Sequence, residues 1–165
     1  MAPSSRSSAP APTLAEGMPA PAFSLPRDGG GTVSLADFKG RKLVLYFYPK
    51  ADTPGCTLEA QDFSRLKPRF AAAGADILGV SADPVPALDK FRDKHGLAIA
   101  LASDETTAML SAYDAWGEKS MYGRTFMGVT RKTVLVGPDG KVARIWPKVT
   151  VAGHAEEVLE AARAL

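Results

Sequence analysis

The run of six apolar and aromatic residues from Leu43 to Tyr48 (LVLYFY) is the feature that most constrains the fold of this 165-residue chain. An unbroken run of this length is typical of a central strand that is covered on both faces. A second run, Ile77 to Ser81 (ILGVS), predicts another buried strand, and Ile99 to Leu101 predicts a further short one. Together they indicate one buried sheet.

Helical patterns separate these strands. Phe63, Leu66 and Phe70 recur at three- and four-residue steps, which predicts a helix with one buried stripe that Pro68 should kink or restart. Three more helices are expected: one opened by Asp83-Pro84, one over Glu105 to Trp116, and one over His154 to Ala164.

Turn signals complete the pattern. The turn Gly29–Gly31 precedes a short strand or hairpin arm at 32–35, and the sequence Gly137-Pro138-Asp139-Gly140 is flanked by the strands Thr133–Val136 and Val142–Ile145. The alternation of strands and helices predicts an α/β fold, with a central mixed sheet flanked by helices on both faces. In such sheets chemistry collects where strands end and helices begin.

The composition is that of an ordinary globular protein. It is 45% hydrophobic and 23% charged with a net charge of +2, which argues against disorder and against nucleic acid or an anionic membrane as the main partner. Residues 14–165 are expected to form one domain, and the Pro-, Ser- and Ala-rich residues 1–13 a disordered tail. No apolar segment suits a secretory signal or a membrane helix, so the predicted location is the cytoplasm.

The junction that follows the Leu43–Tyr48 strand holds the only cysteine, Cys56. Thr53 suits the N-cap of a helix and Pro54 its first position, so Cys56 falls at the third position. Unpaired backbone N–H groups and the helix dipole favour the nucleophilic thiolate there. The Thr53 hydroxyl is expected to hydrogen-bond to the sulfur or to a substrate oxygen, and Pro49 to shield the sulfur from water.

A buried structural cysteine is the alternative interpretation, because most free cysteines are of that kind. Gly55 and Thr57 flank Cys56 in place of a hydrophobic stripe, and the position at a helix start favours a functional thiol. One cysteine excludes an intramolecular disulfide, and His95 and His154 are too far apart to suggest a metal site. Neither a metal nor a cofactor is therefore expected.

The residues around Cys56 resemble the active site of the peroxiredoxins. The spacing Pro49-x-x-x-Thr53-x-x-Cys56 matches the PxxxTxxC motif of that family, and the string FYPKADTPGCTLEAQDF is similar to the bacterioferritin-comigratory protein, or Q-type, subfamily. The likeness extends from about Met18 to the C-terminus and includes LGVSAD and MYGRTFMGVTRKTVLVGPDGKV. It implies a thioredoxin-like fold for residues 14–165.

The resemblance also implies an activity, the reduction of hydrogen peroxide and organic hydroperoxides, with Cys56 becoming a sulfenic acid. Arg131, in GVTRKT, matches the family's active-site arginine, which favours the thiolate and holds the peroxide oxygens. The Thr53 hydroxyl and the Cys56 N–H would help to stabilise charge on the leaving oxygen. Glu59 is expected to orient Arg131. The other residues expected at the substrate pocket are Tyr48 and Gly55.

The chain departs from the subfamily pattern at the resolving cysteine. Many members carry it five residues after the peroxidatic one, where this chain has Gln61, and others carry it on the next helix, at a place aligned with Arg92. A one-cysteine member is therefore implied. Its sulfenic acid would be resolved by an external thiol (thioredoxin, glutaredoxin or glutathione) or by Cys56 of another protomer. A monomer or weak homodimer is expected, because family members include both.

Two other functions stay open at this level. A monothiol disulfide oxidoreductase or glutathione-linked transferase on the same fold is disfavoured, because Thr130 and Arg131 occupy the region where thioredoxins place a cis-proline. A non-catalytic thioredoxin-fold binding module is disfavoured by the joint presence of Thr53, Cys56 and Arg131. Consumption of hydrogen peroxide in the presence of dithiothreitol distinguishes these functions from a peroxidase.

Overall fold

The computed structural model describes residues 13–165, so the expected tail lies outside the described residues apart from its last one. No helix within this part of the chain is long and apolar enough to cross a membrane. In chain order the elements are β1 (Ser24–Pro26), β2 (Thr32–Ser34), the short 3-10 helix η2 (Leu35–Phe38), β3 (Lys42–Phe47), α1 (Pro54–Ala72), β4 (Ala75–Ser81), α2 (Val85–His95), β5 (Ala100–Ser103), α3 (Ala108–Ala112), β6 (Trp116–Met121), β7 (Arg124–Val129), β8 (Lys132–Val136), β9 (Val142–Trp146) and α4 (His154–Ala164).

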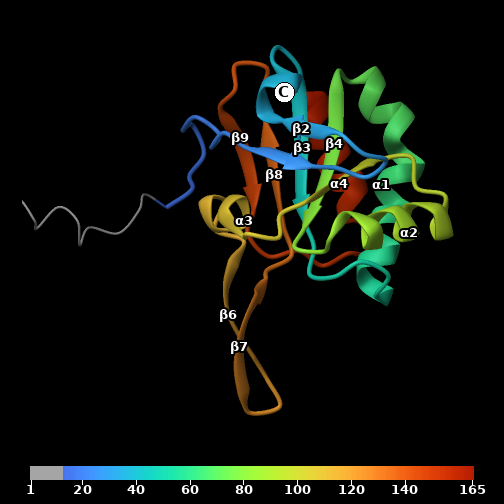
Figure 1. Ribbon diagram of the computed structural model, residues 1–165. Coiled ribbons are helices and arrows are strands. Elements are labelled where there is room, and N and C mark those ends of the chain that lie inside the picture. Colours follow the sequence, from blue (N-terminus) through green and yellow to red (C-terminus); the bar gives the residue numbers. More distant parts are fainter. Residues whose placement is uncertain (1–12) are drawn as a thin grey trace, which may run out of the picture.

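β3 is the central strand of a five-stranded sheet in the order β5-β4-β3-β8-β9 (Figure 1). β4 runs parallel to β3 and β5 parallel to β4, whereas β8 is antiparallel to β3 and β9 to β8. Both the central strand and the mixed sheet are thus confirmed. The predicted hairpins are also present: Gly29–Gly31 lies between β1 and β2, and Gly137–Gly140 joins β8 to β9.

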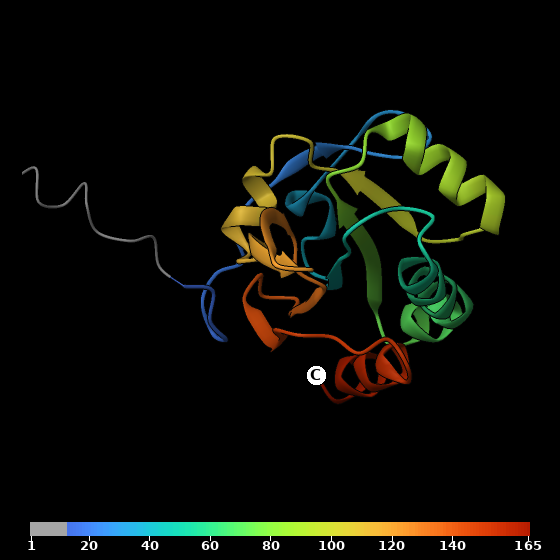
Figure 2. The same cartoon turned by 90° about the horizontal axis from the view of Figure 1, so that it is seen from below.

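Helices cover both faces of the sheet, as expected (Figure 2). On one face α1, α2 and α4 contribute Phe63, Phe91 and Val158 to a common hydrophobic core. On the other face α3 and the β1–β2 hairpin contribute Leu110 and Val33 to a second core. The residues of β3 alternate between these two cores, because successive side chains of a strand point to opposite faces. β3 is therefore held from both sides.

Pro68 does not restart α1, which is one of the two effects predicted for it. The helix continues through it, and Phe63, Leu66 and Phe70 form the expected buried stripe. Proline cannot donate to the carbonyl four residues earlier, which here belongs to Ser64. Pro68 lies on the exposed side of α1, where water can satisfy the released carbonyl. The buried side of the helix keeps its packing.

The helix expected over Glu105–Trp116 is much shorter, since α3 covers only Ala108–Ala112. The backbone is left-handed at Thr107 (φ 65°) before the helix and at Asp114 (φ 56°) after it. Such conformations cannot continue an α-helix. Trp116, the last residue of the expected helix, begins β6.

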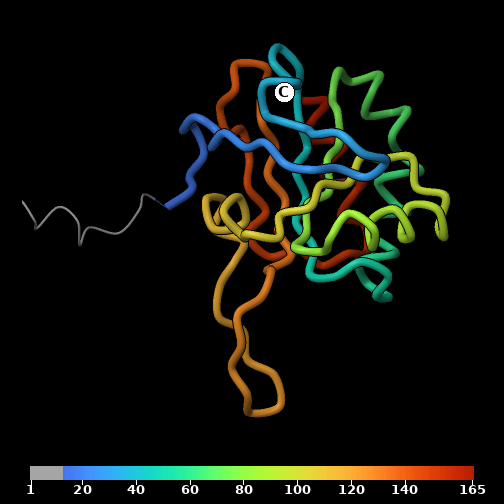
Figure 3. The backbone as a smooth tube through the Cα atoms, viewed as in Figure 1, coloured from blue at the N-terminus to red at the C-terminus, as the bar shows by residue number. Residues whose placement is uncertain are grey.

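β6 and β7 form a hairpin that the sequence analysis did not predict and that projects from the body of the molecule (Figure 3). Its turn is Tyr122-Gly123, with φ positive at both residues (53° and 75°), as a type I′ turn requires. Met121, Phe126 and Met127 are exposed, so the strands lack the buried and exposed alternation by which a strand is recognised. Arg131 follows this hairpin in the chain, two residues after β7 ends.

Gly79→Ala is expected to lower the free energy of unfolding by about 1–3 kcal/mol, because it overpacks the core. Gly79 in β4 lies beside Tyr46 of β3, whose ring stacks on Phe63 with 4.7 Å between centroids. A Cβ atom on Gly79 would lie 2.7 Å from Cζ of Tyr46. Chemical denaturation measures the loss. Gly117→Ala in β6 is the matched control, since a Cβ there meets nothing within 4 Å, and an equal loss in both variants would refute the steric explanation.

Candidate active site

Cys56 occupies the third position of α1, as predicted, because the helix begins at Pro54. Only 1% of the residue is exposed, and it belongs to the same core as Tyr48 and Phe91. In Figures 1 and 2 the loop that leads from β3 into α1 lies beside α2 and at the same end of the molecule as the β6–β7 hairpin. The thiol therefore sits where the central strand ends and a helix begins.

Two carboxylates hold the loop before Cys56. Asp83, after β4, accepts a hydrogen bond from the Ala51 N–H at 2.8 Å. Asp52, at a left-handed turn with φ 62°, lies 2.9 Å from both Lys94 Nζ and His95 Nε2 of α2. These contacts join residues 32 to 43 positions apart, so no local pattern in the sequence could have revealed them. The loop is anchored to both β4 and α2.

Thr53 is the N-cap residue of α1, but its side chain does not cap the helix. Its hydroxyl donates to the Lys50 carbonyl oxygen at 2.7 Å. The expected bond between this hydroxyl and the Cys56 sulfur is not formed among the described residues. A hydroxyl whose proton is engaged keeps its lone pairs free to accept a hydrogen bond. Thr53 is thus prepared to accept from a ligand beside the thiol.

Arg131 lies between β7 and β8 and joins two residues of α1. Its Nη2 donates to the Cys56 sulfur at 3.4 Å, and its Nη1 donates to Glu59 Oε1 at 2.7 Å. Cys56 and Glu59 are three positions apart and therefore lie on one side of the helix. The structure thus brings Cys56, Glu59 and Arg131 together, three of the residues that the resemblance placed at the site.

Glu59 is a buried carboxyl group, with only 1% of its side chain exposed. One of its oxygens, Oε2, has no hydrogen-bond partner. Burial raises the pKa of Glu59 to about 7, although the charge and the hydrogen bond of Arg131 oppose the change. Near neutral pH both forms of this carboxyl group are therefore populated.

The other predicted pocket residues differ in their burial and surroundings. A Cβ atom on Gly55 would lie 3.2 Å from Arg131 Nη2, so the lack of a side chain lets the guanidinium approach. Tyr48 is fully buried in the core behind Cys56, and its hydroxyl has no hydrogen-bond partner. Pro49 is partly exposed at the start of the loop. Its shielding of the sulfur stays a prediction.

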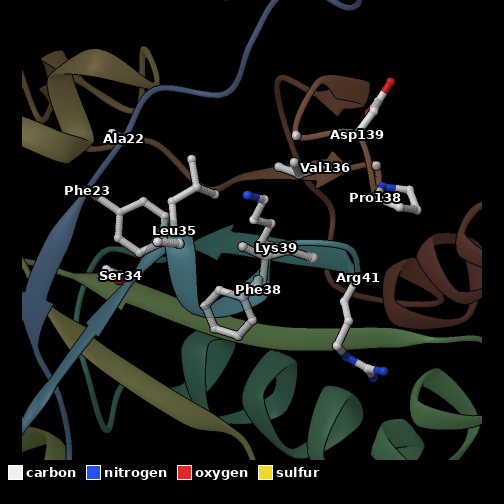
Figure 4. A pocket seen from close by; sticks show the side chains of 14 residues that line it. Ala22, Phe23, Ser34, Leu35, Phe38, Lys39, Arg41, Val136, Pro138 and Asp139 are labelled. Carbon is white, nitrogen blue, oxygen red and sulfur yellow. The ribbon is translucent and has the colours of Figure 1, made fainter.

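A cavity of about 570 Å³ lies away from the thiol, near the start of β3 (Figure 4). It is mainly apolar and is lined in part by Phe23, Phe38 and Leu43, with Lys39 among them. Cys56 instead follows the far end of β3. Within residues 13–165 no three His, Cys, Asp or Glu side chains are grouped to hold a metal ion. The thiol site is recognised by its polar contacts and not by cavity size.

Known proteins are similar to this chain over most of its length. Residues 17–145 match the model of the AhpC/TSA family. The chain is 48% identical over 149 residues to peroxiredoxin Bcp of Xanthomonas campestris, which covers 89% of this chain and 93% of that protein. It is 42% identical over 148 residues to peroxiredoxin Bcp of Bacillus subtilis, covering 90% and 94% of the two chains.

Solved structures of similar proteins have the same fold as this chain. Peroxiredoxin Q of Xanthomonas campestris has a TM-score of 0.82 at 48% identity, over 86% of this chain and 90% of that chain. A cysteine-to-serine mutant of Xylella fastidiosa PrxQ has a TM-score of 0.88 at 37% identity, over 93% and 98%. A trapped intermediate/ligand complex of Xanthomonas campestris bacterioferritin comigratory protein, solved for insights into its alkyl peroxide reduction activity, has a TM-score of 0.82 at 47% identity, over 86% and 90%.

The fold and the site thus define a thiol-dependent peroxidase with a thioredoxin-like fold, and the chain belongs to the AhpC/TSA family. Within that family it is a peroxiredoxin of the bacterioferritin-comigratory, or Q, type whose sequence holds a single cysteine. The resemblance seen in the sequence is confirmed. The peroxidase interpretation prevails over the monothiol oxidoreductase and the non-catalytic binding module.

Replacing Glu59 should change how stability depends on pH. The ordinary pKa of a glutamate is 4.5, whereas that of Glu59 in the folded protein is about 7. Between these values the folded protein keeps a proton that the unfolded chain has released, so this carboxyl group makes stability fall as the pH rises. The free energy of unfolding of the wild type minus that of Glu59→Gln is expected to fall by about 1–3 kcal/mol across this window.

Denaturant unfolding at a series of pH values measures this difference. Glu156→Gln is the control, because Arg65 lowers the pKa of Glu156. Its difference should rise with pH, and only below about pH 4.5, where the unfolded chain still binds the proton. A difference for Glu59→Gln that stays flat between pH 4.5 and 7 would contradict the raised pKa.

Proposed function

We propose that Cys56 is the peroxidatic cysteine of a one-cysteine peroxidase that reduces hydrogen peroxide and alkyl hydroperoxides at the expense of an external thiol. The observation that carries this proposal is the contact of the Arg131 guanidinium with both the Cys56 sulfur and Glu59. A permanent cation beside sulfur favours the thiolate, which is the attacking form. The alkyl peroxide reduction of the Xanthomonas campestris relative supports the same substrate class.

The first step joins the Cys56 sulfur to the terminal peroxide oxygen. The S–O bond forms as the O–O bond breaks, and the leaving oxygen takes a proton to become water or an alcohol, so that Cys56 is left as a sulfenic acid. Arg131 has further N–H donors that would stabilise the charge on the leaving oxygen. Glu59 fixes the guanidinium through the 2.7 Å bond and acts as a positioning residue.

Thr53 supports the first step as an acceptor in this proposal, and not as the donor expected from the sequence. Its proton is directed at the Lys50 carbonyl, so its lone pairs can accept the O–H of an incoming hydroperoxide. This hydrogen bond would turn the terminal oxygen toward the sulfur. Gly55 leaves room for Arg131, Tyr48 forms the wall behind the thiol, and Pro49 limits the access of water.

The second step needs a thiol from outside the chain, because no second cysteine is present. The external thiol displaces the sulfenic hydroxyl as water and forms a mixed disulfide, which a second thiol then reduces. Residues 14–165 form the catalytic domain in this proposal. A monomer or weak homodimer and a cytoplasmic location stay predictions from the sequence.

Thr53→Val should lower kcat/KM for hydrogen peroxide by more than about tenfold, or roughly 1.4 kcal/mol, because valine keeps the shape and removes the acceptor. Thr53→Ser keeps the hydroxyl and should stay within about threefold of the wild type. Stopped-flow peroxide consumption measures both. Were the two variants equally active, Thr53 would serve only the loop structure.

Excess hydrogen peroxide should add one, then two, then three oxygen atoms to the Cys56 peptide, since the sulfenic acid has no thiol of its own chain to condense with. A thiol added after the first equivalent should give a mixed disulfide and preserve activity. Intact-mass and peptide mass spectra follow these products, with Cys56→Ser as the blank. Cys56 is 1% exposed, so two sulfurs cannot meet without local opening. Quantitative disulfide-linked dimer at one equivalent would replace the external thiol by resolution between protomers.

A further inference from the structure

A second concave site lies beside the loop that leads from β3 to Cys56 at the start of α1, the catalytic turn. It encloses about 550 Å³ between residues 50–52 of this loop and one side of α2, with Ala51 and Phe91 as its apolar walls. In Figures 1 and 2 this loop lies next to α2. The volume is in the range of small-molecule sites. Residues 50–52 of the cavity wall are therefore followed directly in the chain by Thr53 and, three residues later, by Cys56.

The charges on this cavity favour an anion. Two of its three carboxylates contact basic side chains, Asp52 with Lys94 and His95 and Asp93 with Arg92. Asp83 accepts hydrogen bonds only from the neutral Ala51 N–H and Ser81 hydroxyl and keeps its charge. Lys50 and Lys90, which also line the cavity, form no ion pair or side-chain hydrogen bond within residues 13–165. Two ammonium groups without an ion-pair partner thus line the cavity, one from the loop and one from α2, against the single unpaired carboxylate of Asp83.

We infer that this cavity binds the reductant, and that the reductant is an anionic low-molecular-weight thiol with at least one carboxylate, such as a cysteine-containing tripeptide. The inference rests on the proposed function. Lys50 and Lys90 would pair with the carboxylates, while Phe91 and Ala51 contact the aliphatic part. A tripeptide spans about 10 Å when extended, which suits a ligand that is anchored on α2 and carries its thiol toward the catalytic turn.

A small thiol also fits the burial of the sulfur. Cys56 is 1% exposed, so a flexible small molecule reaches it with less displacement of the loop than a folded protein thiol requires. The thiolate attacks the sulfenic sulfur, the S–O bond breaks, and the hydroxyl leaves as water with the proton of the thiol. A second molecule of the same thiol attacks the mixed disulfide, releasing its symmetrical disulfide and reduced Cys56.

The test compares glutathione, which has two carboxylates, with its diethyl ester, which has the same thiol and neither charge. Cys56 is first oxidised with one equivalent of hydrogen peroxide, and the rate of re-reduction by each thiol is followed by trapping of the remaining sulfenic acid. At low ionic strength we expect wild type to react about tenfold faster with glutathione than with the ester, and the K50E/K90E variant to lose this preference.

The ratio of the two rates cancels any effect of the substitutions on the sulfenic acid itself. Lys148→Glu, an exposed change outside the cavity, should keep the wild-type ratio, and so should K50R/K90R, which keeps both positive charges. An unchanged ratio in K50E/K90E overturns the inference. Reduction by thioredoxin that is far faster than by glutathione and unaffected by K50E/K90E overturns it too. Failure of Cys56 to form a sulfenic acid would instead refute the proposed function.

Discussion

The contacts of Arg131 with α1 are the interaction on which the rest of the site depends. One guanidinium reaches the Cys56 sulfur at 3.4 Å and Glu59 at 2.7 Å, and so ties the start of β8 to the first turns of α1. Glu59 is almost fully buried, and a buried charge without its partner is strongly destabilising. The hydrogen bond to Glu59 sets the direction of the guanidinium, and Gly55 leaves the space that this direction needs.

Such an arrangement requires that β8 and α1 keep a fixed relation, and β3 provides it. β3 pairs with β8 on one side and with β4 on the other, and Tyr46 of β3 stacks on Phe63 of α1. The interior is close-packed, so it resists small displacements. The loop between β3 and α1 is held separately, by Asp83 and by the contacts of Asp52 with α2. The thiol site thus combines a rigid scaffold with a clamped loop.

Local signals in the sequence predicted what local interactions determine. The apolar run of β3 and the Thr53-Pro54 helix start placed Cys56 at its observed position. The contact of Arg131 with Cys56 joins residues 75 positions apart, so only the family resemblance could suggest it. The β6–β7 hairpin was missed because its strands are largely exposed. Pro68 does not restart α1 because it lies on the exposed side of the helix, where water can donate a hydrogen bond to the carbonyl that it frees. The Thr53 bond to Lys50 depends on a left-handed turn at Asp52 that propensity does not specify.

The two positions where the family resemblance would place a resolving cysteine hold polar residues in this chain. Gln61 lies on the exposed side of α1, away from the stripe that holds Cys56. Arg92 of α2 pairs at 3.1 Å with Asp28, whose carboxylate is 4% exposed and also accepts the Leu101 N–H. This ion pair fastens α2 to the β1–β2 turn and to β5. α2 therefore acts as a fixed wall beside the catalytic loop and supplies no thiol to Cys56.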